Sequence, residues 1–149
     1  MNLESIMARR GKLQPVIKLK QRREQQAGKQ LQQCNEQREH HSQLLNQLQR
    51  YREEYLAQME RALKGGTSVT QLDAYRAMLA ELDDALVKQK TALQWAENDW
   101  RVAHEAWQVA RSQVEALSGL SHQYARQGQR LAEVIEQDQQ EDAHRNRSH

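Results

Sequence analysis

The feature that most constrains this chain is a run of apolar residues spaced alternately three and four positions apart between residues 72 and 117. Only one position in the run, Gln89, is polar. A strict 3.5-residue period keeps one side of a helix against a partner only when the two helices supercoil. The repeat therefore predicts a left-handed coiled coil. Its positions are Leu72, Tyr75, Leu79, Leu82, Leu86, Gln89, Leu93, Ala96, Trp100, Ala103, Trp107, Ala110, Val114 and Leu117.

A looser version of the same spacing runs from Leu13 to Ala62 and supplies the partner helix. Between the two runs, Gly65 and Gly66 can end the first helix, because glycine readily takes the left-handed conformation of a helix C-terminus. Ser68 and Gln71 form a capping-box pattern that opens the second helix. The fold class predicted is all-α, a long two-helix antiparallel coiled-coil hairpin.

We predict five segments along the chain. Pro15 is tolerated only near a helix start, which places the beginning of the first helix at about residue 14. Beyond about residue 125 we expect no partner for the second helix, and the last residues are polar and expected to fray. The segments are a basic arm (1–13), the first helix (14–63), a turn (64–68), the second helix (69–125), and an unpaired extension with a polar tail (126–149).

Composition favours a thin, extended fold over a globular one. Only 38% of the residues are hydrophobic, Phe is absent, and 28% are charged. Disorder is disfavoured, since 22 Lys and Arg nearly balance 20 Asp and Glu and there is a single Pro. Folding back at the glycines would place Trp107 and Ala103 opposite the Ala27–Gly28 neighbourhood and Trp100 near Leu31, so we interpret both tryptophans as core residues.

No motif of a catalytic or metal-binding site is found. The chain lacks a nucleophile elbow and a phosphate-binding loop, and its histidines do not converge at ligand spacing. The lone Cys34 lies in the predicted seam, where a buried inert thiol is expected. No apolar run is long enough to span a bilayer. We predict a protein that is not an enzyme, has no cofactor or metal, and does not cross a membrane.

Positive charge is concentrated at the start of the chain, where residues 1–30 contain eight basic and two acidic side chains. Such a segment can bind nucleic acid, anionic lipid or an acidic protein surface. Aromatic residues are not interleaved with these charges, so base stacking has no support, and a merely solvated helix end explains them equally well. The candidate contacts, called the basic segment below, are Arg9, Arg10, Lys18, Lys20, Arg22 and Arg23.

A second apolar stripe runs beside the seam near the predicted turn. A two-stranded seam cannot bury both stripes, so we expect some of these groups to be exposed and available to a partner. The alternative is that they widen the hairpin core. The stripe contains Leu44, Leu48, Tyr51 and Tyr55 on the first helix, with Tyr75, Met78, Leu82 and Ala85 on the second.

Residues 48–89 resemble the FliJ family of flagellar export proteins, and the resemblance extends over about residues 13–120. Upstream, Arg23, Glu24, Ala27 and Leu31 look like the family's first helix, and Leu93, Trp107 and Leu117 match its seam. Met78 departs from the pattern, because the family usually has Phe there. The pattern that carries the resemblance is Leu48, Tyr51, Arg52, Tyr55, Gly66, Gln71, Leu72, Tyr75, Leu79, Leu82, Ala85 and Gln89.

The resemblance implies a non-enzymatic stalk or adaptor of the flagellar type III protein-export apparatus, at the cytoplasmic face of the inner membrane below the basal body. It implies that the end carrying both termini meets the ring of the export ATPase FliI, and that the hairpin tip meets the export gate protein FlhA. FliH and export chaperones are further implied partners. The basic segment would then contact the ring. The gate set would be Leu48, Tyr51, Tyr55, Met78, Leu82 and Ala85.

Three other interpretations remain open from the sequence. The same fold serves as the stalk of a virulence-type secretion system. A nucleic-acid-binding helical hairpin would use the basic segment and show a steep salt dependence. A self-associating scaffold would pair hairpins through the apolar stripe.

Overall fold

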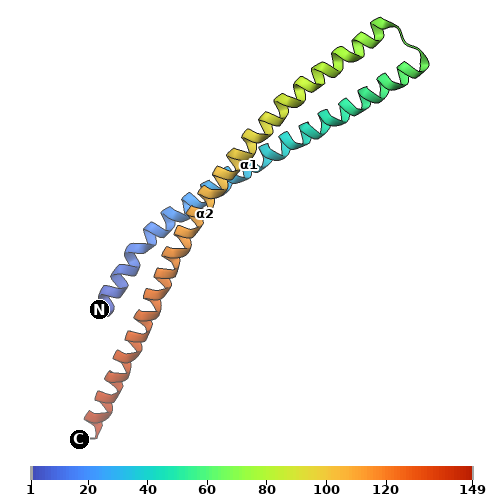
Figure 1. Cartoon of the computed structure of the whole chain (residues 1–149). Helices are drawn as coiled ribbons and strands as arrows, with labels where there is room; N and C mark the ends of the chain where they lie inside the picture. Colours follow the sequence, from blue (N-terminus) through green and yellow to red (C-terminus); the bar gives the residue numbers. More distant parts are fainter. Residues whose placement is uncertain (1, 149) are drawn as a thin grey trace. The chain divides into compact units, whose positions relative to one another are not determined.

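The computed structural model describes residues 2–148 and contains two helices joined by a short turn (Figure 1). The first, α1, is Leu3–Gly65, and the second, α2, is Val69–Arg147. No strand occurs in residues 2–148. The predicted all-α, antiparallel coiled-coil hairpin is confirmed.

The two helices contribute to two compact units, which we describe separately. The terminal unit comprises Met1–Gly28 and Ala106–His149, and therefore contains both ends of the chain. The hairpin unit comprises Lys29–Glu105 and contains the turn. Within each unit, one segment of α1 packs against an antiparallel segment of α2.

The turn follows its sequence in the glycine conformation and in the Ser68 half of the predicted capping box, whereas the Gln71 side chain pairs with Thr67. Gly66 has a φ of 80°, the left-handed region in which a side chain would be strained. The backbone N–H of Gln71 donates to Ser68 Oγ at 3.2 Å, and that of Leu72 donates to the Ser68 carbonyl at 3.0 Å. Ser68 thus caps α2, which begins at Val69 as predicted. The Gln71 side chain accepts a hydrogen bond from the Thr67 hydroxyl at 2.8 Å.

The core of both units is the predicted seam. Every seam position that the repeat identifies is buried or half-buried. In the hairpin unit the most buried seam residues are Leu82, Leu86, Ala96 and Ala103, while Ile6 and Ile17 are the most buried apolar residues of the terminal unit. Even these retain 5–8% of their surface, so the hydrophobic effect here acts through a thin seam rather than a closed core.

Polar contacts also join the two helices at seam positions, in both units. In the hairpin unit, Gln89 Nε2 lies 3.0 Å from His41 Nδ1 and donates to the His41 carbonyl at 2.9 Å. In the terminal unit, Gln14 Nε2 donates to Ser121 Oγ at 3.1 Å. A polar group inside a coiled-coil seam favours the one register in which its partner is opposite. Both pairs therefore help to specify which residues of α1 face which residues of α2.

The predicted start of the first helix at about residue 14 is wrong, because α1 begins at Leu3. Asn2 caps it, with its Oδ1 accepting from the backbone N–H of Ser5 at 2.8 Å. Pro15 consequently lies inside the helix, where it removes one backbone hydrogen bond. Ile6 lies before this proline and is only 5% exposed, so burial of the first turns offsets the local loss.

The paired part of α2 also extends further than expected. Leu3 and Ile6 lie against Gly128, with side-chain atoms 3.7 and 3.6 Å from where a Cβ would stand. Burial continues to Leu131, and only residues 132–148 are exposed throughout. The expected fraying of the tail is likewise not seen, since α2 remains helical to Arg147. Ala, Glu and Gln favour helix, and Arg145 pairs with Asp142 at 3.7 Å.

Candidate partner-binding surfaces

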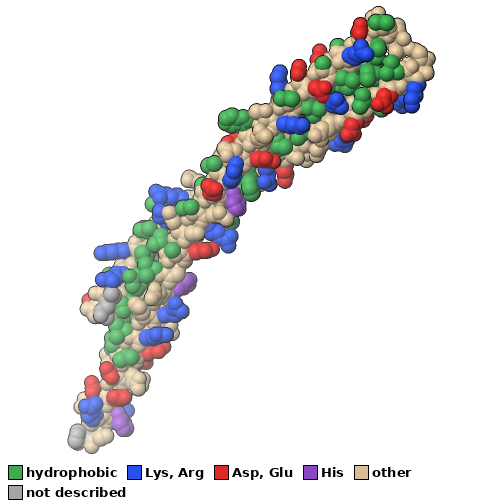
Figure 2. Space-filling model, viewed as in Figure 1, with side chains coloured by type: hydrophobic (Ala, Val, Ile, Leu, Met, Phe, Trp, Pro, Cys, Tyr) green, Lys and Arg blue, Asp and Glu red, His purple; other side chains and the backbone are tan. Residues whose placement is uncertain are grey.

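In the apolar stripe of the hairpin unit, Tyr51 is exposed and the other residues are buried or half-buried. Tyr51 keeps 50% of its surface exposed. Tyr55 is half-buried and packs edge-on against Tyr75, with ring centroids 6.1 Å apart. Such a pair is favoured by the opposite charges of ring edge and face, and here it joins α1 to α2. Hydrophobic side chains gather between charged ones near the turn in Figure 2.

The six residues of the predicted gate set all lie in the hairpin unit, but they are not equally accessible. Leu82 is 8% exposed and belongs to the seam, so a partner cannot reach it without separating the helices. Leu48, Met78 and Ala85 are half-buried. Of the six residues, Tyr51 is therefore the most accessible to a partner. The half-buried residues expose only part of their side chains.

A salt bridge joins the helices beside this surface. Arg52 Nε donates to Asp83 Oδ1 at 2.6 Å. The hydrogen bond and the negative charge of Asp83 raise the pKa of Arg52 above its already high usual value. Since both side chains are substantially exposed, the bridge orients groups next to Tyr51 more than it stabilises the fold.

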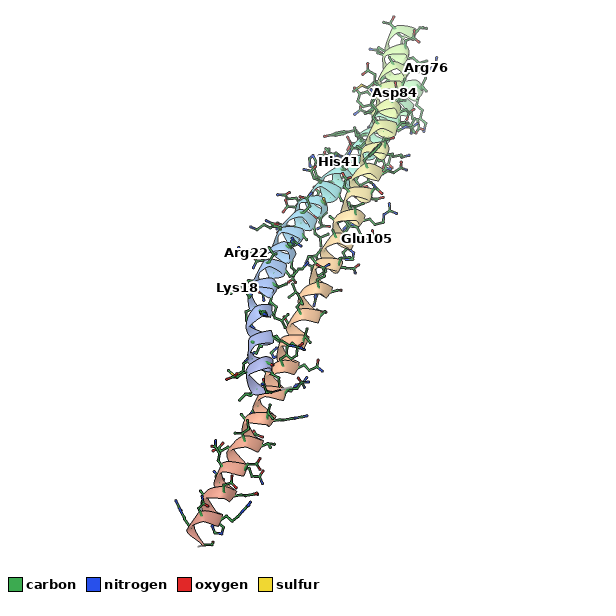
Figure 3. The ribbon with its side chains drawn as sticks, turned by 90° about the vertical axis from the view of Figure 1, so that its left-hand side faces the viewer. Lys18, Arg22, His41, Arg76, Asp84 and Glu105 are labelled. Atoms are coloured by element: carbon green, nitrogen blue, oxygen red, sulfur yellow. The ribbon has the colours of Figure 1, made fainter. Side chains whose placement is uncertain are left out.

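The basic segment lies in the terminal unit as part of α1, rather than in an arm that precedes the helix. Lys20 is half-buried at a seam position, while the other five cations are exposed. Lys18 and Arg22 extend from α1 on the side away from α2 (Figure 3). Among residues 2–148, none of the six takes part in an ion pair. Their charges are therefore available to an anionic partner.

Two of the three tryptophans pack against residues of the other helix. In the terminal unit, Trp107 packs over Gly28, where a Cβ would lie 3.6 Å from the indole, so the predicted large-against-small pairing is confirmed. In the hairpin unit, Trp100 is stacked on His104 at 5.0 Å and has the Arg38 guanidinium 4.1 Å from its ring centroid. This cation–π contact stabilises the packing of the half-buried Trp100 indole against α1.

Sequence reasoning missed an exposed apolar face on α2 in the hairpin unit. Trp95 is 68% exposed, and Val87 and Val102 are also largely exposed. The repeat contains the signal for this face, because Trp95 and Val102 are seven residues apart and both fall outside the seam positions.

Other kinds of site find no support in the described part of the chain. His, Cys, Asp and Glu side chains within residues 2–148 form no group of three that could hold a metal ion. Neither helix has a stretch long and apolar enough to cross a membrane over those residues.

Two long antiparallel helices packed along a thin seam define a class of all-α helical hairpins. The chain belongs to the FliJ family: the family model described as Flagellar FliJ protein matches residues 9–144. Membership makes it a protein related to flagellar export. Searches of curated proteins and of solved structures found no significant match.

Proposed function

We propose that this protein is a non-enzymatic stalk or adaptor that couples the ring of the export ATPase FliI to the export gate protein FlhA. The observation that carries the proposal is that one helical hairpin has two exposed surfaces of different chemistry. One is a set of unpaired cations and the other is an exposed tyrosine beside a packed aromatic pair. Coupling requires two distinct sites on one molecule, each biased by its own partner.

The proposed gate contact centres on Tyr51. Exposed tyrosines are frequent anchors of protein interfaces, since a rigid amphipathic ring buries much area at little entropic cost. Leu48, Tyr55, Met78 and Ala85 would complete the contact, whereas Leu82 would support it from the seam. Tyr55 and Tyr75 hold the two helices together under this surface, which presents Tyr51 on a stiff support.

The proposed ring contact uses the basic segment. Its exposed cations would attract an acidic surface of the ATPase ring over the range of a Debye length, about 8–10 Å at physiological salt. Such binding weakens as salt rises because exposed charges are screened. Handling of export chaperones, contact with FliH, and a position at the cytoplasmic face of the inner membrane belong to the same proposal, and family membership is what supports them.

The experiment that tests the gate contact compares two variants of matched exposure in the hairpin unit. Tyr51→Ala removes the proposed anchor, and Leu63→Ala removes a side chain that is also 50% exposed but lies outside the gate set. Retention on the immobilised cytoplasmic domain of the cognate FlhA should fall at least tenfold for Tyr51→Ala only. Equal retention of both variants would remove Tyr51 from the gate contact.

The ring contact is tested by neutralising five exposed cations in each unit. The first variant changes Arg9, Arg10, Lys18, Arg22 and Arg23 to Gln, and the control changes Arg50, Arg61, Arg76, Lys88 and Lys90, which are also exposed. We expect only the first variant to lose binding to the ATPase ring, with gate binding intact. If instead the wild type binds RNA with a steep salt slope and neither protein partner, the nucleic-acid interpretation replaces the proposal.

A further inference from the structure

One side of the terminal unit combines exposed aliphatic residues with positive charge. Val16 is 41% exposed and Leu19 is 46% exposed, and the two lie one turn apart on the same side of α1. Figure 2 shows Lys and Arg side chains beside a band of hydrophobic ones in the terminal unit. Every charged residue three, four or seven positions from Val16 or Leu19 is basic, namely Arg9, Lys12, Lys20, Arg22 and Arg23. Aliphatic side chains left in water among cations favour a partner that is both apolar and acidic.

The heptad repeat places Val16 beside the seam. In a coiled coil the seam occupies positions a and d of each heptad, and position g borders the seam. Because Leu13 and Ile17 are at d and a, Val16 is at g and Leu19 is at c, the next position outward. On α2 the same count puts the half-buried Leu120 at g. The g positions of two antiparallel helices lie on the same side of their seam, so Val16 and Leu120 border one groove between α1 and α2.

Positions g and c of the terminal unit carry positive charge and no negative charge. Within residues 5–26 of α1 and 106–130 of α2, these positions hold four cations and no Asp or Glu. The two carboxylates in those ranges, Glu24 and Glu115, are at positions a and b. The four cations are exposed, and none of them takes part in an ion pair among residues 2–148. They are Arg9, Lys12, Arg23 and Arg130.

The corresponding side of the hairpin unit has a different charge pattern. There, positions g and c include Glu54, Glu81 and Asp99 as well as cations. A partner that carries carboxylates at its flanks would be attracted along the terminal unit and partly repelled along the hairpin unit. Charge therefore selects the terminal unit for such a partner.

We propose that the groove bordered by Val16, Leu19 and Leu120 binds an acidic amphipathic helix of a partner protein. Aliphatic residues of that helix, at alternating three and four spacing, would face these three side chains, and its Asp or Glu residues would lie beside the four cations. The inference deepens the proposed ring contact. It rests on the proposed function in placing a protein partner at the basic segment, and it adds the class of partner and an apolar contact.

The shape of the surface favours a helix over other anionic partners. Position g lies in the groove between two helices, where the ridges of a third helix can enter. A flat bilayer would meet the outer positions of both helices first. The phosphates of nucleic acid would pair with the cations and leave Val16 and Leu19 in water. On α2 the groove is bordered by Gln113, Gln123 and Gln127, which can form hydrogen bonds with the polar flank of a bound helix.

The test uses the full chain and a labelled synthetic peptide of about 18 residues, or five helical turns. The peptide has Leu and Ile at seam spacing with Glu at the flanks, and a control peptide has Lys in place of every Glu. Fluorescence anisotropy should show that only the Glu peptide binds. Val16→Ala/Leu19→Ala should weaken its binding about tenfold or more, because the aliphatic contact is lost. Val69→Ala/Leu63→Ala, which truncates an exposed Val and Leu of the hairpin unit, should leave binding unchanged.

A second pair of variants isolates the charge on this side of α1. Lys12→Gln/Arg23→Gln should weaken binding of the Glu peptide about five- to tenfold. Lys18→Gln/Arg22→Gln removes the same charge from positions b and f of the same helix, and should change binding less than about twofold at physiological salt. Circular dichroism verifies that each variant is helical, which is expected because all the changed residues are exposed.

Four outcomes would overturn the proposal. The first is that the Glu peptide does not bind the wild type, and the second is that the Glu and Lys peptides bind alike. The third is that the alanine pair in the groove binds the Glu peptide as tightly as its control pair does. The fourth is that sedimentation shows a dimer of the chain alone that Val16→Ala/Leu19→Ala dissolves, which would assign the groove to a second copy, whose residues 133–142 are acidic.

Failure of this inference is separable from failure of the proposed function. Val16→Ala/Leu19→Ala keeps every cation of the basic segment, so ring binding through charge alone would survive in this variant. A chain that binds the FliI ring and not the Glu peptide would contradict only the groove. A chain that binds the Glu peptide through Val16 and Leu19 and not the ring would contradict only the proposed function.

Discussion

Trp95 and Trp100 are five residues apart on α2 and differ in what surrounds them. Trp100 is half-buried between Arg38 and His104, whereas Trp95 is 68% exposed. Truncating a fully buried aromatic side chain costs roughly 3–5 kcal/mol, and we expect a half-buried one to cost about 2 kcal/mol. Trp100→Ala should therefore lower the free energy of unfolding by about 2 kcal/mol in urea denaturation, and Trp95→Ala by less than about 0.5 kcal/mol. Equal losses would contradict the assigned surroundings.

The two glycines of the turn, Gly65 and Gly66, differ in backbone conformation. Gly66 has a φ of 80°, while Gly65 ends α1 without a positive φ. Gly66→Ala should lower the free energy of unfolding by about 1 kcal/mol, because a Cβ is strained in the left-handed region. Gly65→Ala should be neutral or slightly stabilising, since no atom lies within 4 Å of its added methyl group. Thermal unfolding followed by circular dichroism distinguishes the two.

At the scale of elements, the start of α1 is the sharpest difference between sequence expectation and structure. Pro15 lies within the helix, so Pro15→Ala restores a missing N–H and relieves the clash of the ring with the preceding turn. Helix content should rise, and the free energy of unfolding should increase by about 1–3 kcal/mol. If neither helix content nor the free energy of unfolding rose, the turns before residue 14 would contribute little to the helix. That result would agree with the helix start predicted from Pro15.

Across the whole molecule, the seam residues of each helix are buried or half-buried by the other helix of the same chain. We therefore expect a monomer in sedimentation velocity, with a Tm that does not change over a fiftyfold range of protein concentration. Self-association would couple unfolding to dissociation and raise the Tm with concentration. A dimer that Tyr51→Ala dissolves would instead support the self-associating scaffold.

The seam could be predicted because its signal is local to each helix. Residues such as Leu82, Leu86 and Ala96 follow a spacing that only a helix with one packed side explains, and all are buried. The accessible part of the candidate site was harder to predict. Leu82 satisfies both the seam and the apolar stripe by spacing, and its burial depends on how α1 lies over it.

The helix ends depended on pairing that no local rule contains. Pro15 is a strong local signal for a helix start. The helix nevertheless begins earlier, because Leu3 and Ile6 pack against Gly128 of α2. The same contact shows that α2 stays paired beyond residue 125. Local propensity carries a few kcal/mol at most, and burial across the seam can exceed it.

The sequence by itself determined the all-α hairpin, the turn at Gly66 and the positions of the seam, because periodicity, glycine conformation and helix capping act within a few neighbouring residues. Only the tertiary structure decided the accessibility of each side chain. Tyr51 and Trp95 are exposed, Leu82 is buried, and Val134 and Ile135 remain uncovered on α2. Accessibility depends on which residues of the other helix lie opposite, and that is a property of two segments distant in the chain.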